Sequence, residues 1–288
     1  MLAIVFGGVL RAEEPAPAPD APPPAESRTE TMAWRELRLA AGREREIWER
    51  VRAASDDDLA RKRAEAEFRD VITAYENVIR AAPEMAEAYA AYGLLLGRTG
   101  NRAESTAALL KANKLDPNIP MVKNQLGNIL AEDGNYNQAM AYYLSAIELN
   151  NDEPLYHYQL GSLLHAYRDF FLDDKTFDRA TLDGKMQAAF RRAAELAPDN
   201  WPYIYRYAES FYDLETPDWQ AALAEWRKLE EKAPEGLGKQ TIRLHLAKVL
   251  IEMGNRAEAT GLIATITEPA LAEQKQTVVA HLEEAAKQ

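Results

Sequence analysis

The chain has 288 residues, of which 47% are hydrophobic and 28% are charged, and its formal net charge is −12. Such a chain can bury a substantial core, but its acidic balance disfavours nucleic acid and anionic lipid as main ligands, because like charges repel. The absence of cysteine excludes disulfides, thiolate metal sites and cysteine nucleophiles. The four histidines form no compact cluster in the sequence, so we expect no metal site and no cofactor.

An apolar run lies at the N-terminus, where residues 2–10 read LAIVFGGVL. The run is too short to span a bilayer but suits the apolar region of a secretory signal. We therefore expect a signal peptide over residues 1–12 and export to the periplasm or the exterior after cleavage. No basic residue precedes the run, and a cytoplasmic protein is the alternative. Residues 13–26 are rich in Pro and Ala, which predicts a disordered linker.

Helical spacing of apolar residues follows the linker, and residues 27–70 are predicted to form an N-terminal helical segment. Trp34 and Trp48 lie on the apolar face of its first helix, and Glu44 interrupts that face. The next helix should end before Pro83, because proline has no N–H to donate and disfavours helix in the residue before it.

Three glycines, Gly93, Gly127 and Gly161, are separated by steps of 34 residues, and each is followed three residues later by leucine. The first two units also share a Gly-Asn pair, at residues 100–101 and 134–135. Both residue types tolerate positive φ, so these pairs predict turns. A fixed period of this length indicates one helix-turn-helix unit copied along the chain.

The repeated residues resemble the tetratricopeptide repeat family, whose units have Leu-Gly in the first helix and Ala, an aromatic residue and Ala before Pro in the second. The matching residues are Leu126-Gly127 and Leu160-Gly161, then Ala139, Tyr143 and Ala146, and again Phe190, Ala193 and Pro198. The resemblance implies an all-α fold, a right-handed α-α superhelix of about five to six repeats with N-terminal helices and a C-terminal capping helix. We assign residues 71–288 to this repeat domain.

The period slips in the second half of the chain. Gly254-Asn255 repeats the turn of Gly134-Asn135 after 120 residues, which is 18 more than three periods of 34. We place most of the extra residues in an insertion at about 165–185. Its acidic residues lack the glycine and the late glutamate that a calcium loop needs. Its aromatic residues make it a second binding candidate, unless they cover the helices of their own repeat.

No catalytic constellation is visible, since no Gly-rich phosphate loop follows a strand pattern and no serine lies in a nucleophile elbow. We therefore predict that the protein is not an enzyme and has no catalytic residues. The resemblance implies instead that the first helices of the repeats line a concave face that binds a peptide. The candidate groove residues are Asn124, Asn128, Tyr158, Ser162, His165, Tyr205, Glu209 and Tyr212.

Such side chains suit a peptide, because asparagine both donates to and accepts from a backbone and tyrosine adds contact area. In the alternative, the tyrosines pack against the next repeat and the asparagines are solvated. We expect a non-catalytic scaffold that binds a peptide or a partner protein, without nucleic acid and without a membrane span. A structural, self-assembling protein of the cell envelope is the alternative. The sequence indicates neither the identity of the partner nor the oligomeric state.

Overall fold

The computed structural model of the protein describes residues 31–53 and 58–286. Within these ranges the regular secondary structure is entirely helical, with fourteen α-helices and no strand. The expected all-α fold class is therefore confirmed. The expected signal peptide (residues 1–12) and linker (residues 13–26) lie outside the described residues.

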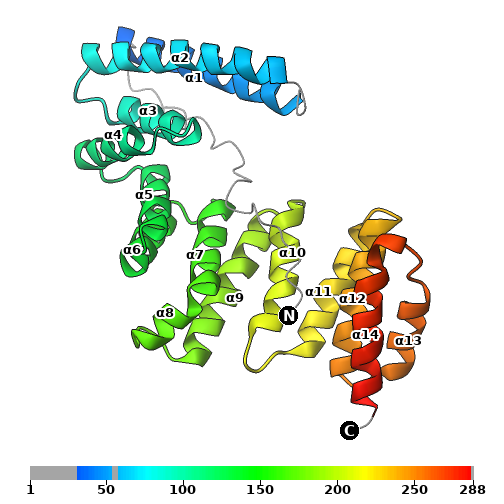
Figure 1. The fold of residues 1–288 in the computed structure, drawn as a ribbon. Coiled ribbons are helices and arrows are strands. Elements are labelled where there is room, and N and C mark those ends of the chain that lie inside the picture. The colour runs from blue at the N-terminus through cyan, green and yellow to red at the C-terminus, as the bar shows by residue number, and fades with distance from the viewer. Residues whose placement is uncertain (1–30, 54–57, 287–288) are drawn as a thin grey trace. The chain divides into compact units, whose positions relative to one another are not determined.

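The chain divides into two compact units, and unit 1 covers Met1–Asn150. Its described helices form three antiparallel hairpins that lie one against the next (Figure 1). The pairs are α1 (Met32–Ala53) with α2 (Asp58–Ala81), α3 (Ala86–Arg98) with α4 (Arg102–Leu115), and α5 (Pro120–Glu132) with α6 (Tyr136–Leu149). The helix before Pro83 ends at Ala81, as predicted.

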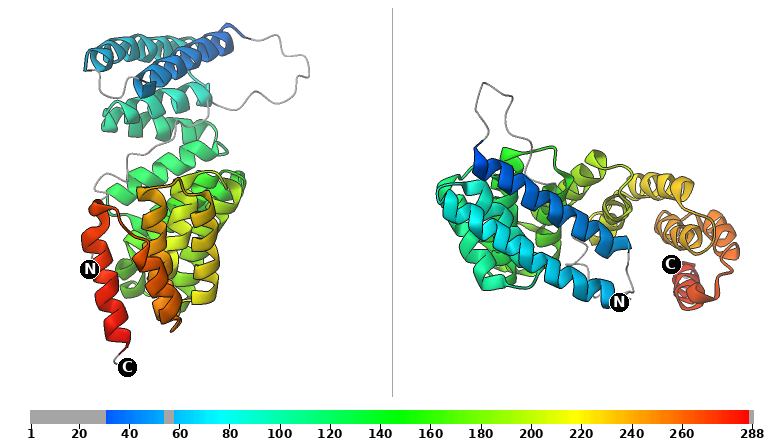
Figure 2. Two further views of the ribbon diagram at one scale, coloured as in Figure 1. Left: turned by 90° about the vertical axis from the view of Figure 1, so that its right-hand side faces the viewer. Right: turned by 90° about the horizontal axis from the view of Figure 1, so that it is seen from above.

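Unit 2 covers Asn151–Gln288 and also consists of hairpins. The pairs are α7 (Pro154–Ala166) with α9 (Arg179–Leu196), α10 (Trp201–Ser210) with α11 (Trp219–Lys232), and α12 (Leu237–Glu252) with α13 (Arg256–Ala264). The short α8 (Arg168–Asp173) follows α7, and a 3₁₀ turn, η2 (Phe211–Asp213), extends α10. The last helix, α14 (Ala272–Ala285), packs on α12 and α13 as the expected capping helix (Figures 1 and 2).

Glycines at the 34-residue period allow the two helices of a hairpin to approach closely. An added Cβ would lie 2.9 Å from Leu109 Cγ at Gly93, 2.7 Å from Tyr143 Cε1 at Gly127, and 2.8 Å from Phe190 Cδ1 at Gly161. These distances are too short for carbon atoms in a close-packed interior, so a larger residue would push the helices apart. The repeated glycine therefore has the same packing role in three hairpins.

At the hairpin turns, positive φ occurs at the glycine and not at the asparagine. Gly100 and Gly134 have φ of +88° and +78°, whereas Asn101 and Asn135 have φ of −87° and −90°. The turns predicted at both pairs are therefore confirmed, and the glycine is the residue that takes the positive φ. Each asparagine is instead the N-cap residue of the second helix, a position with negative φ that favours asparagine.

The residue expected to interrupt the apolar face of α1 is part of the core. Glu44 is buried and accepts hydrogen bonds from Tyr75 Oη (2.7 Å), Trp48 Nε1 (3.2 Å) and Arg98 Nη1 (3.2 Å). Burial, followed by the charge of Glu44, raises the pKa of Tyr75. Glu44 therefore connects α1 to α2 and α3, because each of its hydrogen bonds replaces one lost to water.

The insertion after α7 folds back on its own repeat. Phe171 is fully buried, with its ring centroid 5.4 Å from that of Phe170 and 6.1 Å from that of Phe177. The second helix of the repeat, α9, already begins at Arg179, inside the expected range of 165–185. The helix that carries Phe170 and Phe171, α8, packs on α7 and α9, which favours the alternative in which these aromatic residues cover the helices of their own repeat.

Candidate functional site

The first helix of each hairpin has a small residue at the position of the periodic glycine. The residue that follows this small residue occupies an equivalent position in each hairpin. In unit 2 these residues are Ser162 of α7, Glu209 of α10 and Lys248 of α12, which follow Gly161, Ala208 and Ala247. All three are partly exposed, and side-chain contacts connect α7 to α10 and α10 to α12. We call Ser162, Glu209 and Lys248 the polar row.

Tyr158 packs between repeats beside the polar row. Its ring centroid lies 4.9 Å from that of Tyr203 on α10 and 5.8 Å from that of Phe190 on α9. Burial raises the pKa of Tyr158, against smaller opposing effects of Arg206 and of the Ser162 side chain. These contacts agree with the alternative in which this tyrosine packs against the next repeat, while its hydroxyl borders the polar row.

Asp213 joins α7 to the end of α10. Its carboxylate lies 3.2 Å from Nε2 of His165 and accepts from Nη2 of Arg206 at 2.9 Å, while its backbone oxygen accepts from Nη2 of Arg179 at 2.8 Å. Burial alone would raise the pKa of Asp213, but the His165 hydrogen bond and the charge of Arg206 hold that pKa below its usual value. His165 is thus engaged by an acid that the sequence analysis did not select.

Tyr205 and Tyr212 belong to an aromatic cluster around His245. The His245 ring stacks on Trp226 with centroids 4.1 Å apart, its Nε2 lies 2.9 Å from Tyr205 Oη, and its backbone oxygen accepts from Tyr212 Oη at 3.3 Å. Burial lowers the pKa of His245 to about 3 and raises the pKa values of both tyrosines. The two tyrosines therefore bind α10 to α12, which again agrees with packing against the next repeat.

Glu209 and Lys248 are the charged members of the polar row. Neither forms a hydrogen bond or a direct ion pair with any residue that the structure describes. Burial raises the pKa of Glu209 and lowers that of Lys248, and the charge of each opposes the shift of the other. The two groups are thus near enough to interact electrostatically without touching. Partly desolvated charges with unused bonding capacity are uncommon and indicate a candidate binding site.

The two candidate asparagines lie in unit 1, on α5. Asn124 is 1% exposed, and its amide oxygen and nitrogen have no partner among the described residues. Asn128 is partly exposed, but its Oδ1 accepts from Tyr143 Oη at 2.6 Å and its Nδ2 donates to Gln125 Oε1 at 3.2 Å. The expectation that Asn124 lines an open face was therefore wrong, because neighbouring side chains cover it.

The sequence analysis missed Lys248, Arg206 and Asp213. Lys248 lies 39 residues after Glu209, which is one period plus the five residues of a second slip, so extending the register to the fifth repeat would have identified it. For Arg206 and Asp213 no such periodic signal exists. Their importance comes from hydrogen bonds to each other and to residues of α7 and α9.

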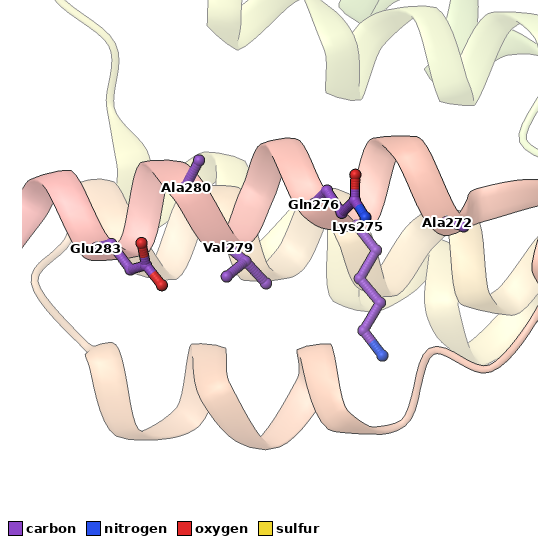
Figure 3. A pocket seen from close by; sticks show the side chains of 6 residues that line it. All are labelled: Ala272, Lys275, Gln276, Val279, Ala280 and Glu283. Atoms are coloured by element: carbon purple, nitrogen blue, oxygen red, sulfur yellow. The ribbon is translucent and has the colours of Figure 1, made fainter.

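A hollow of about 470 Å³ lies on the last helix. Figure 3 shows its lining, which comes from α14 alone and consists of Ala272, Lys275, Gln276, Val279, Ala280 and Glu283. Because all of its lining side chains belong to one helix, we do not assign a site there. Within residues 31–53 and 58–286, no group of three or more His, Asp or Glu side chains could hold a metal ion. No helix in that part of the chain is long and apolar enough to cross a membrane.

Two family models match the chain. One, described as a tetratricopeptide repeat, matches residues 86–119, which form the α3–α4 hairpin, and the other, described as a TPR repeat, matches residues 127–166. The chain therefore contains tetratricopeptide repeats. The matched repeats contain Gly93, Gly127 and Gly161, which confirms the resemblance inferred from these glycines.

Solved structures support the same fold for this TPR protein. YrrB, described as a TPR protein with an unusual peptide-binding site, is 15% identical with a TM-score of 0.54 over 74% of this chain and 98% of its own. Pseudomonas aeruginosa PilF is 13% identical with a TM-score of 0.54, over 88% and 99%. PilW, a type IV pilus biogenesis factor, is 14% identical with a TM-score of 0.52, over 84% and 98%. A search of curated proteins found no match.

Proposed function

We propose that this TPR protein is a non-catalytic interaction scaffold and that the first helices of unit 2 bind an extended peptide, or an extended segment of a partner protein, across the polar row. One observation carries this proposal. Ser162, Glu209 and Lys248 occupy one register in three successive first helices, and the two charged members have no bonding partner among the described residues.

The arrangement suits an extended ligand. Side-chain contacts join α7 to α10 and α10 to α12, so the three positions follow one another in a row along which an extended chain can lie. Repeat proteins bind along such surfaces because each unit adds one contact position. The peptide-binding site of YrrB, a protein of similar fold, is consistent with this use of the fold.

Selection of peptides tests the proposal. A random peptide library displayed on phage is selected on the purified full chain, and binders are remeasured with Ser162→Trp. We expect the indole to obstruct the polar row and weaken binding about 10-fold or more. Far-UV circular dichroism should be unchanged. Ser162 is a cleaner choice than Tyr158, whose ring packs against Tyr203.

Arg191→Trp is the matched control, because Arg191 is exposed on α9, a second helix. It should leave the binding of the selected peptides unchanged. If the peptides bind Ser162→Trp as tightly as the unaltered chain, binding across the polar row is ruled out.

Self-association is a second candidate function, favoured by one observation in unit 1. Leu110 on α4 and Leu144 on α6 are one period apart and are 50% and 48% exposed. Light scattering tests this candidate. A dimer that Leu110→Glu converts to monomer supports it, and a monomer at high micromolar concentration argues against it.

Export before function is a further part of the proposal. It is supported by the apolar run of residues 2–10. N-terminal sequencing of the native protein tests it: a mature chain that starts near Glu13 supports export, and a chain that retains residues 2–10 contradicts it.

A further inference from the structure

Charges of both signs surround Glu209. Arg206, His165 and Lys248 lower its pKa and Asp213 raises it, and Arg206 and His165 are themselves paired with Asp213 at 2.9 Å and 3.2 Å. A cationic ligand group at Glu209 would be repelled by Lys248, and an anionic group at Lys248 would be repelled by Glu209. The local field therefore favours a ligand group that is neutral but dipolar over a charged side chain.

The peptide backbone is such a group, because each residue other than proline offers one N–H donor and one C=O acceptor. We infer that the partner is recognised here through its main chain, with Glu209 accepting from a backbone N–H and Lys248 donating to a backbone C=O of an extended segment. Hydrogen bonds with one ionised member are about twice as strong as neutral ones. This inference rests on the proposed function and names the ligand chemistry at two of the three positions of the polar row.

The surroundings of the pair support this inference. The charge of Glu209 influences the pKa values of Tyr158, Tyr205 and Tyr212, so three aromatic side chains lie near the carboxylate. Partial exclusion of water strengthens a hydrogen bond formed there. Tyr205 and His245 lie about one helical turn before Glu209 and Lys248 and are joined at 2.9 Å, so both charged groups can reach one short stretch of backbone. Recognition at this point is then independent of the ligand's side chains.

A direct test combines a change in the backbone of the peptide with a change in a side chain of the protein and asks whether their effects on affinity are coupled. The tightest peptide from the library is synthesised in a series with one amide N-methylated at a time, and each is titrated by fluorescence anisotropy against the full chain. We expect one N-methyl position to weaken binding about 10-fold on the unaltered chain but less than 2-fold on Glu209→Ala. Lys248→Met should weaken the parent peptide by a similar factor. Glu231→Ala, on the exposed surface of α11, should change neither value.

Either of two results would overturn the inference and leave the proposed function intact. One is a peptide that loses affinity on Ser162→Trp but shows no N-methyl position whose effect depends on Glu209. The other is coupling of Glu209 to a lysine or arginine side chain of the peptide, or of Lys248 to an acidic one, found by alanine scanning. If no peptide sensitive to Ser162→Trp is recovered, the proposed function itself fails, and the inference fails with it.

Discussion

Each unit holds a glutamate that packing removes from water, almost wholly at Glu44 and partly at Glu209, and the two differ in their hydrogen-bond partners. Glu44 in unit 1 accepts from Tyr75, Trp48 and Arg98. Glu209 in unit 2 accepts from no described residue. The first carboxylate is therefore a structural connection, whereas the second retains its bonding capacity for a ligand. Burial by itself does not separate these two roles, but the presence or absence of partners does.

The largest expected effect on the free energy of unfolding comes from removing Glu44, whose carboxylate is fully hydrogen-bonded. Glu44→Ala leaves Arg98, whose side chain is 15% exposed, without its counter-ion, and it removes the acceptor of the Tyr75 hydroxyl. Breaking a buried pair typically costs 3–5 kcal/mol. We expect urea unfolding followed by circular dichroism to show a loss of about 3 kcal/mol.

Glu46→Ala is the control for this change, because Glu46 is exposed on the same helix. It should alter the free energy of unfolding by less than about 0.5 kcal/mol. Equal losses for the two variants would mean that the Glu44 contacts contribute nothing specific.

A pair of glycines extends the comparison to packing. An added Cβ at Gly127 in unit 1 meets Tyr143 at 2.7 Å, whereas at Gly184 in unit 2 it meets nothing within 4 Å. Gly127→Ala should therefore destabilise by about 2 kcal/mol through overpacking. Gly184→Ala, inside the exposed surface of α9, should stabilise by about 0.5–1 kcal/mol, because alanine is the better helix former. Thermal melting of both variants should shift in opposite directions, and shifts of the same sign would contradict the close-approach role of Gly127.

Acid should weaken unit 2 through His245. Its pKa is about 3 in the folded chain and near 6.5 when unfolded. The folded chain thus favours the neutral imidazole. The contribution of His245 to the free energy of unfolding is complete above pH 6.5 and is lost as the pH falls towards 3. Between pH 7.5 and 5.5 we expect a loss of about 1.4 kcal/mol. His245→Phe should lack this part of the pH dependence, and an unchanged pH profile in that variant would show that His245 does not titrate as proposed.

The smallest expected effect on stability concerns the unpaired carboxylate. Glu209→Gln removes a charge that has no hydrogen bond to lose within the described chain, so we expect the free energy of unfolding to change by no more than about 0.5 kcal/mol or to rise slightly. Chemical denaturation gives this value under the same conditions as for Glu44→Ala. A loss of 2 kcal/mol or more would show that Glu209 is structural, like Glu44, and would remove the contrast between the units.

Much of the fold could be predicted because its signals are local and periodic. Gly93, Gly127 and Gly161 mark close approaches within one hairpin, and the Gly-Asn pairs mark its turn, so both depend on residues less than one repeat away. Tyr158 shows where this reasoning stops. Its register placed it correctly on a first helix, but its contact with Tyr203 depends on a repeat that begins after an insertion.

The candidate site could be predicted only in part. Ser162 and Glu209 were selected from their register, which the structure retains in α7 and α10. Lys248 was missed because the second slip was not carried into the fifth repeat. Asn124 was selected from its position in the repeat, but it is 1% exposed. The repeat position predicts the direction of a side chain and does not show which other side chains cover it.

The sequence alone determined the helical hairpins, their turns and the family, because a 34-residue period with glycine at each close approach has few other physical solutions. The tertiary structure decided which polar groups are satisfied. Glu44 and Glu209 cannot be told apart by residue type or helical spacing. Their difference depends on whether donors from other helices reach the carboxylate, which only three-dimensional packing settles.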